Sequence, residues 1–214
     1  MEISKILEKK YGVEVHDFYN VPFNDLWDGI NELIPLIREE DKLIVFVAGH
    51  GYFESKTKTA AIVLSDSKAA NMDPRLDSYF HFSRLSQLLE GLDCKNIFAI
   101  FDVCFGASFS PNADDLPLTN YDKQDVDLTV FEKRMNEGTT RIFLASGKYE
   151  VPDYWNNSLD HSPFAAKVIY ALNEEKEFIT PSKIYGYAKG NATAPEIKQF
   201  RGHDENTDFI LKVR

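Results

Sequence analysis

Three short stretches of the chain are apolar at almost every position, and each has the length of a β-strand. They are residues 43–48 (LIVFVA), 97–103 (IFAIFDV) and 141–145 (RIFLA), and they are rich in β-branched and aromatic side chains. Strands that are apolar on both faces are typical of parallel sheets with helices on each side. The pattern therefore predicts a buried, parallel sheet.

The segments between these runs carry apolar residues at helical spacing. This spacing predicts helices over residues 3–10, 24–37, 83–92, 130–136, 162–172 and 180–188. Asn24 and Ser83 are the expected caps of the second and third helices, and Pro163 suits the first turn of the fifth. Further strands are expected at residues 13–19, 60–64 and 209–213. Alternating strands and helices predict an α/β fold with a mostly parallel central sheet.

One segment breaks the alternation. Residues 107–127 hold five aspartates, two prolines and few large apolar residues. We expect an acidic linker loop there, inside a single domain that spans residues 1–214.

Composition narrows the class of protein. Hydrophobic residues make up 43% and charged residues 27%, as in ordered globular proteins. The net charge of -10 argues against binding to nucleic acid, for which a basic patch is expected. No apolar run approaches the ~20 residues of a membrane span, and the opening residues MEISKILEKKYG do not resemble a signal peptide. We therefore expect a cytoplasmic protein with no membrane contact.

The chain has two cysteines, Cys94 and Cys104. An extended strand between them would separate them by about 30 Å, whereas a disulfide needs Cα atoms within ~7 Å. We therefore expect Cys104 to be a thiol. Two cysteines also cannot form a cysteine-rich zinc site, and neither HExxH nor CxxC occurs, so no metal site is predicted.

His50 and Cys104 each follow one of the buried runs and lie next to a glycine. Ligands of open α/β sheets gather beyond the carboxyl ends of the strands. A thiol beside an imidazole is a nucleophile with its base, and the backbone N–H groups of Gly51 and Cys104 could stabilise an oxyanion. These residues predict acyl transfer, with a peptide bond as the target. The alternative is that each is a structural residue, a small core cysteine and a hydrogen-bonded histidine.

These residues also resemble a known family. AGHG at 48–51 and DVCFG at 102–106 are similar to the catalytic blocks of caspase-like cysteine peptidases, in which the histidine lies about 50 residues before the cysteine. RIFLASG at 141–147, DHSPFAAKVIYAL at 160–172 and TDFILKV near the end continue the resemblance. It implies a three-layer α/β/α sandwich and a cysteine endopeptidase that uses a Cys-His dyad.

The resemblance also exposes an irregular start. The family's sheet normally begins with a central strand before the first helix, whereas this chain opens on that helix, and residues 13–19 resemble the family's second strand. We expect a sheet that lacks the usual first strand. The chain could be truncated, could be part of a larger protein, or could receive the strand in another way.

Asp102 distinguishes this chain from true caspases, which have glutamine at that position and cleave after aspartate. An acid there resembles metacaspases and implies an S1 pocket for Arg or Lys, since a carboxylate pairs well with both. Otherwise Asp102 is a structural carboxylate. Ser146 is expected to contact the P1 residue through its backbone, and Asp153 is preferred to Glu150 as a second S1 acid.

The acidic loop has three interpretations. It could be a solvated linker, a linker cleaved after Lys123, Lys133 or Arg134, or a Ca²⁺ site, although no EF-hand spacing is present. We expect no cofactor, with Ca²⁺ activation as an open alternative. The expected partners are protein or peptide substrates and possible regulatory domains. The alternative functions are a catalytically inactive interaction module and a peptide ligase that uses the same acyl-enzyme.

Overall fold

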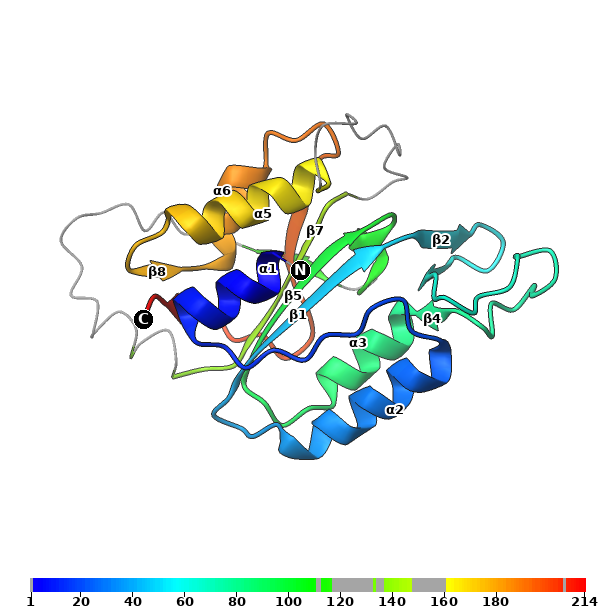
Figure 1. Ribbon diagram of the computed structural model, residues 1–214, viewed down its shortest axis with the longest axis horizontal. Helices are drawn as coiled ribbons and strands as arrows, with labels where there is room; N and C mark the ends of the chain where they lie inside the picture. Colours follow the sequence, from blue (N-terminus) through cyan, green and yellow to red (C-terminus); the bar gives the residue numbers. More distant parts are fainter. Residues whose placement is uncertain (1, 111–112, 117–132, 134–136, 148–160, 206) are drawn as a thin grey trace.

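The computed structural model describes residues 2–110, 113–116, 133, 137–147, 161–205 and 207–214. Its main sheet has five strands in the order β1-β5-β7-β9-β6 (Figure 1). Their bounds are Lys42–Gly49 for β1, Asn96–Val103 for β5, Asp114–Asp115 for β6, Thr140–Ala145 for β7 and Glu196–Gln199 for β9. The first three strands of this order run parallel, while β9 and β6 are antiparallel to their neighbours. The predicted mostly parallel α/β sheet is therefore confirmed.

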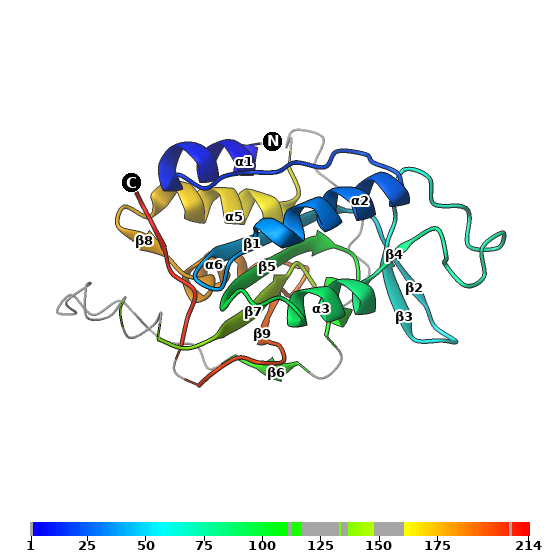
Figure 2. The ribbon, with the colours of Figure 1, turned by 90° about the horizontal axis from the view of Figure 1, so that it is seen from below.

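Helices cover the two faces of this sheet and make three layers (Figures 1 and 2). The first face carries α1 (Glu2–Ile6), the π-helical turn η1 (Leu7–Tyr11), α5 (Pro163–Glu174) and α6 (Pro181–Ala188). The second face carries α2 (Phe23–Leu33), the 3-10 turn η2 (Ile34–Leu36) and α3 (Phe82–Glu90). The α/β/α arrangement agrees with the expected caspase-like fold.

The alternation of β5 explains why a continuous apolar run is needed. Phe98 and Ile100 point into the core beneath α5, whereas Ile97, Ala99 and Phe101 point into the core beneath α3. All five are at most 3% exposed. Burial of each large side chain stabilises the fold by about 1.5–3 kcal/mol, so this strand is a rigid support for whatever follows it.

The helix caps give a mixed result. Pro163 opens α5, as expected, and the preceding Ser162 accepts a hydrogen bond from the backbone N–H of Ala165. However, α2 begins at Phe23 after Pro22, and α3 begins at Phe82 after His81, so the caps expected at Asn24 and Ser83 are wrong. The side chains at both observed starts make no capping hydrogen bond. The N–H of Phe23 instead donates to the carboxylate of Asp66, and both helices pack on the core through their apolar faces.

Several elements differ from the expectation. Residues 13–19 are not a strand, because no neighbouring strand pairs with them among the described residues. The acidic segment is not entirely loop, because it contains the 3-10 turn η3 (Gly106–Ser108) and β6, which pairs with β9. The helix expected over residues 130–136 lies outside the described residues, except for Lys133.

For each of two small sheets the sequence predicted a single strand, at residues 60–64 and 209–213, and missed the others. β2 (Gly51–Glu54), β3 (Thr59–Ile62) and β4 (Phe80–His81) form a separate antiparallel sheet beyond the end of β1. β10 (Leu211–Lys212) pairs with β8 (Phe178–Ile179) outside the main sheet. Both cysteines are thiols, as expected. Within the described ranges, no helix has the length and apolarity needed to cross a membrane.

Candidate active site

The register of β1 and β5 brings the two candidate blocks together. The parallel ladder pairs Ala48 with Asp102 and Gly49 with Val103. His50 and Cys104 are the next residues on each strand, so they leave the sheet side by side at its carboxyl edge. The sequence predicts that His50 and Cys104 face one another on the condition that their strands are neighbours. The sheet order shows that β1 and β5 are neighbours.

A close backbone contact fixes this arrangement. A Cβ atom added to Gly51 would lie 2.0 Å from the carbonyl oxygen of Cys104 and 3.0 Å from a methyl group of Val103. Only glycine permits the chain after His50 to approach the Cys104 backbone so closely. The AGHG block therefore requires its second glycine for contact with the cysteine, in addition to any turn that it makes.

This contact predicts a large effect of Gly51→Ala. The clashing atom belongs to the backbone and cannot rotate away, so we expect a loss of about 2 kcal/mol or more in the free energy of unfolding. Thermal melting measures the loss. Gly186→Ala in α6 is the matched control, since its added Cβ meets nothing within 4 Å and should leave stability equal or higher. Equal melting temperatures for the Gly51→Ala variant and the unaltered protein would contradict the close approach.

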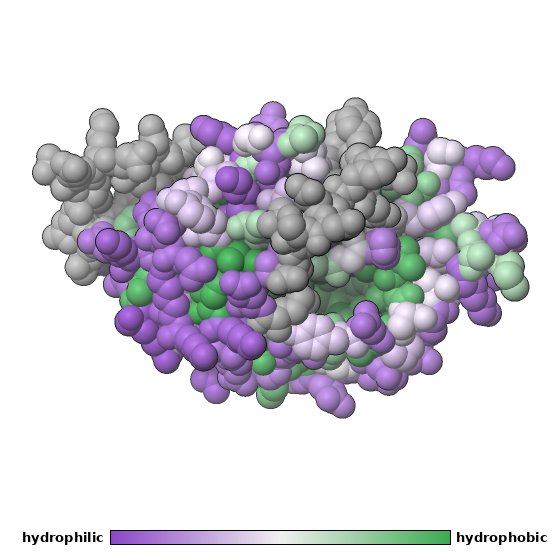
Figure 3. Space-filling model, turned by 45° about the horizontal axis from the view of Figure 1, so that its top comes forward, coloured by the Kyte–Doolittle hydropathy of each residue, from purple (hydrophilic) through white to green (hydrophobic). Residues whose placement is uncertain are grey.

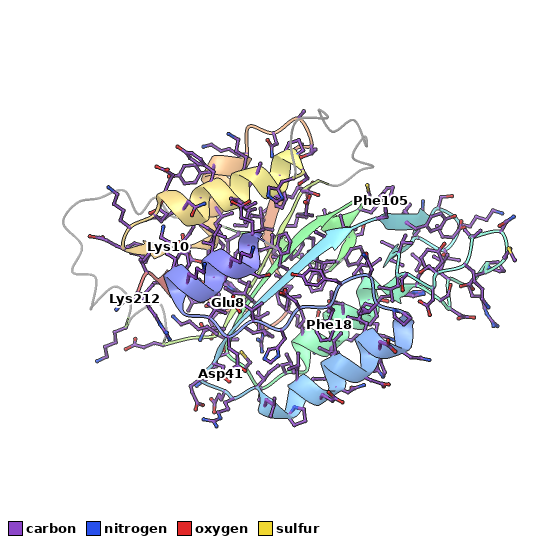
Figure 4. All side chains as sticks on the ribbon, viewed as in Figure 1. Glu8, Lys10, Phe18, Asp41, Phe105 and Lys212 are labelled. Atoms are coloured by element: carbon purple, nitrogen blue, oxygen red, sulfur yellow. The ribbon has the colours of Figure 1, made fainter. Side chains whose placement is uncertain are left out.

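The turn after Cys104 is unusual in its backbone. Phe105 has φ 62°, in the left-handed region, where a residue other than glycine costs about 1 kcal/mol. Its ring stacks on Phe53 of β2, with centroids 5.4 Å apart, and this packing offsets the cost. Figure 4 shows Phe105 beyond the arrowheads of β1 and β5. The stack links the cysteine turn to the sheet that follows His50.

Solvent reaches both candidate catalytic residues. His50 is exposed and Cys104 is half-buried. The carbonyl oxygen of His50 accepts a hydrogen bond of 2.9 Å from the N–H of Val63, just after β3, which ties the backbone of His50 to the small sheet. A substrate can therefore reach an imidazole and a thiol that are held by well-anchored backbone.

Asp102 lies deeper than either of them. It follows the alternation of Phe98 and Ile100, so its side chain belongs to the α5 side of the sheet. The hydroxyl of Ser162 donates a hydrogen bond of 2.5 Å to its carboxylate. Burial raises the pKa of Asp102, while the Ser162 bond lowers it by less, so the net shift is upward. Asp102 is thus a partly buried carboxyl group whose charged form is disfavoured by burial and favoured by the Ser162 hydroxyl.

Sequence reasoning missed the role of Ser162. The sequence indicates Ser162 only as the start of a helix within the DHSPFAAKVIYAL segment, whereas its hydroxyl caps α5 and also donates to Asp102. No local signal identifies the second contact, because residues 102 and 162 are far apart in the sequence.

Of the other residues predicted to contact the P1 side chain, only Ser146 lies within the described part of the chain. Ser146 is 1% exposed, its N–H donates to Phe101 and its hydroxyl to the carbonyl of Val103. Its observed contacts therefore brace the end of β5, and its contact with P1 stays a prediction. Asp153 and the alternative Glu150 lie outside the described residues.

Metal binding has no support from side-chain grouping. Within the described ranges, no three His, Cys, Asp or Glu residues lie close enough together to hold an ion. Asp115 of the acidic segment instead lies 3.9 Å from the ammonium group of Lys198. Calcium activation stays an untested alternative.

A comparison with protein-family models shows a match over most of the chain. The family model Peptidase C14, described as the caspase domain, matches residues 1–185. This range contains His50, Gly51, Asp102, Cys104 and Ser162. No curated protein matches the chain.

Proposed function

The chain belongs to the caspase-domain family of peptidases, and from this premise we propose that it is a cysteine endopeptidase with Cys104 as nucleophile and His50 as base. The family supports a peptidase of the cysteine type. The observation that carries the residue assignment is the register of β1 and β5, together with the Gly51–Cys104 contact. Both observations support the assignment, because His50 and Cys104 follow neighbouring strands at the same edge of the sheet.

In the proposed reaction, His50 accepts the thiol proton and the Cys104 sulfur attacks the substrate carbonyl carbon. The N–H groups of Gly51 and Cys104 stabilise the oxyanion. Protonated His50 then donates its proton to the leaving amine as the C–N bond breaks, which leaves a thioester on Cys104. Water, deprotonated by His50, attacks the thioester and releases the acid and the thiol. An amine in place of water would give ligation by the same intermediate.

We further propose that Asp102 selects Arg or Lys at P1. Asp102 is the penultimate residue of β5 and Cys104 directly follows the strand, so the two residues lie at the same edge of the sheet. A buried carboxylate with a raised pKa gains most from a guanidinium or ammonium partner. Asp153 is the proposed second acid and Ser146 the proposed backbone contact in this pocket.

The second candidate function is an interaction module with no catalysis. The exposed position of His50 and the location of its strand at the edge of the sheet favour this alternative. Catalysis needs the imidazole to be held within hydrogen-bonding reach of the thiol, which an edge strand does less firmly than an inner one.

A panel of fluorogenic peptides with Arg, Lys, Asp or Ala at P1 tests the proposal. We expect release of fluorophore after Arg and Lys, with or without a calcium chelator, and little after Asp or Ala. Release of fluorophore only after Asp would contradict the assignment of Asp102 to the S1 pocket. No release from any peptide by the folded protein would support the interaction module.

A further inference from the structure

The outer edge of β1 has an unusual exposure pattern. β1 ends the main sheet and pairs with β5 on its other side. Its apolar residues 43–47 are all half-buried, although they alternate between the two faces. The matching residues of β5 are almost fully buried. An edge strand that is apolar on both faces is a known liability, because it presents backbone groups and hydrophobic side chains together.

The neighbouring layer shows the same incomplete burial. Among its residues, α2 has none that is fully buried, although its apolar stripe packs toward the core. Leu26, Trp27 and Ile30 of this stripe are only half-buried. On the opposite face, a cavity lies beside Ile44 and Phe46 of β1 and is otherwise lined mainly by apolar residues of other elements. Both layers therefore lack contacts at the β1 side.

An extended segment flanks this side of the sheet. Residues 12–22 run from the first helical layer to α2 along the side of β1 that faces away from β5 (Figures 1 and 2). Phe18 of this segment packs against α2 at Gly29 (Figure 4), while Val13 and Val15 contact the other core. Between this segment and β1 the described chain has no β-ladder. Figure 3 shows apolar side chains at the surface in hollows between polar ones.

We propose that the outer edge of β1 binds an extended strand from a partner polypeptide, apolar on both faces, between β1 and residues 12–22. A strand is the fitting occupant because only a strand satisfies a row of backbone N–H and C=O groups while filling both layers. A sheet of a second copy does not fit, because residues 12–22 lie along the same side. The opposite edge of the sheet does not suit an apolar strand, since β6 consists of the exposed Asp114 and Asp115.

This strand would also affect the proposed active site. β1 carries His50 at its carboxyl end, so pairing on both edges would restrict the imidazole to the position next to Cys104. We expect the peptidase rate to rise on strand binding. This consequence rests on the proposed function, whereas strand binding itself does not.

The test is hydrogen exchange by mass spectrometry on the full chain carrying Cys104→Ala, so that binding is read without catalysis. The probe is a synthetic peptide of about eight alternating valines and isoleucines with lysines at both ends. We expect slower exchange over residues 12–22 and 42–49 and a melting temperature raised by several degrees. The same peptide with prolines at alternate positions lacks the donors and should change neither.

A pair of protein variants locates the binding. Ile44→Glu places a charge beside the cavity and should reduce peptide affinity about tenfold or more. Leu36→Glu, at a residue that is 65% exposed, should leave affinity unchanged. If Ile44→Glu does not fold, the proline peptide still provides the control. No protection at saturating peptide, or protection confined to β6 and β9, would overturn the proposal. Self-association that protects the same residues without peptide would also overturn it, in favour of a second copy.

Discussion

Cys104→Ala is expected to reduce kcat on the best peptide of the panel by roughly 10³-fold or more, because no other group can form the acyl-enzyme. His50→Ala should cause a loss of similar size, and the double variant should be little worse than either single one, since the two act as a unit. Initial rates measured at saturating substrate check this. Additive losses in the double variant would separate the two residues and contradict a dyad.

Cys94→Ala is the matched control for loss of a thiol. Cys94 is fully buried at the opposite end of β5, and its Sγ–H donates to the carbonyl of Asp41. Its removal should lower the free energy of unfolding by about 1–2 kcal/mol and leave kcat unchanged. Loss of activity in the Cys94→Ala variant at a temperature where it is folded would show that the nucleophile is wrongly assigned. Alkylation mapped by mass spectrometry gives a second readout, with Cys104 modified first.

Asp102→Asn is expected to separate stability from specificity. For Arg and Lys peptides, kcat/KM should fall about 10- to 100-fold, because a charge-assisted hydrogen bond is lost. At the same time the variant should unfold at a higher temperature near pH 7, since an amide does not have to be ionised in a buried site. Asparagine can still accept the hydrogen bond from Ser162, so α5 should keep its cap.

The difference in stability between the unaltered protein and the Asp102→Asn variant depends on pH in a direction that the raised pKa fixes. Burial raises the pKa of Asp102, so the folded protein holds its proton at a pH where the unfolded chain has lost it. The stability of the unaltered protein relative to the variant therefore falls as pH rises through the raised pKa. An ordinary aspartate has a pKa of about 4. At a pH below this value, the unaltered protein and the Asp102→Asn variant should have the same melting temperature.

Asp115→Asn is the control for charge removal, since the side chain of Asp115 is 96% exposed. It should change neither the melting temperature nor the P1 preference. Thermal melts between pH 3 and pH 8 and the peptide panel supply both readouts. An Asp102→Asn variant that cleaves Arg peptides at the original rate would place S1 elsewhere. A variant less stable than the unaltered protein at pH 7 would show that the carboxylate is a structural requirement.

Periodicity was sufficient for most of the fold. The runs at 43–48, 97–103 and 141–145 became β1, β5 and β7, because strands that are apolar on both faces suit a sheet covered by helices on each side. Short elements escaped detection, since β4, β6 and β8 have two residues each and depend on their partners. Residues 13–19 failed as a strand for the same reason, because an extended segment needs a partner to become one.

The sequence alone determined the α/β class and the positions of His50 and Cys104 after two buried strands, because both depend on local patterns of apolar residues and glycine. Tertiary structure alone decided that these strands are neighbours, that Gly51 contacts the Cys104 backbone and that Ser162 holds Asp102. It also decided that β1 lies at an edge with its apolar residues half-buried. Sheet order and contacts between distant residues depend on how the whole chain packs, and no local pattern encodes them.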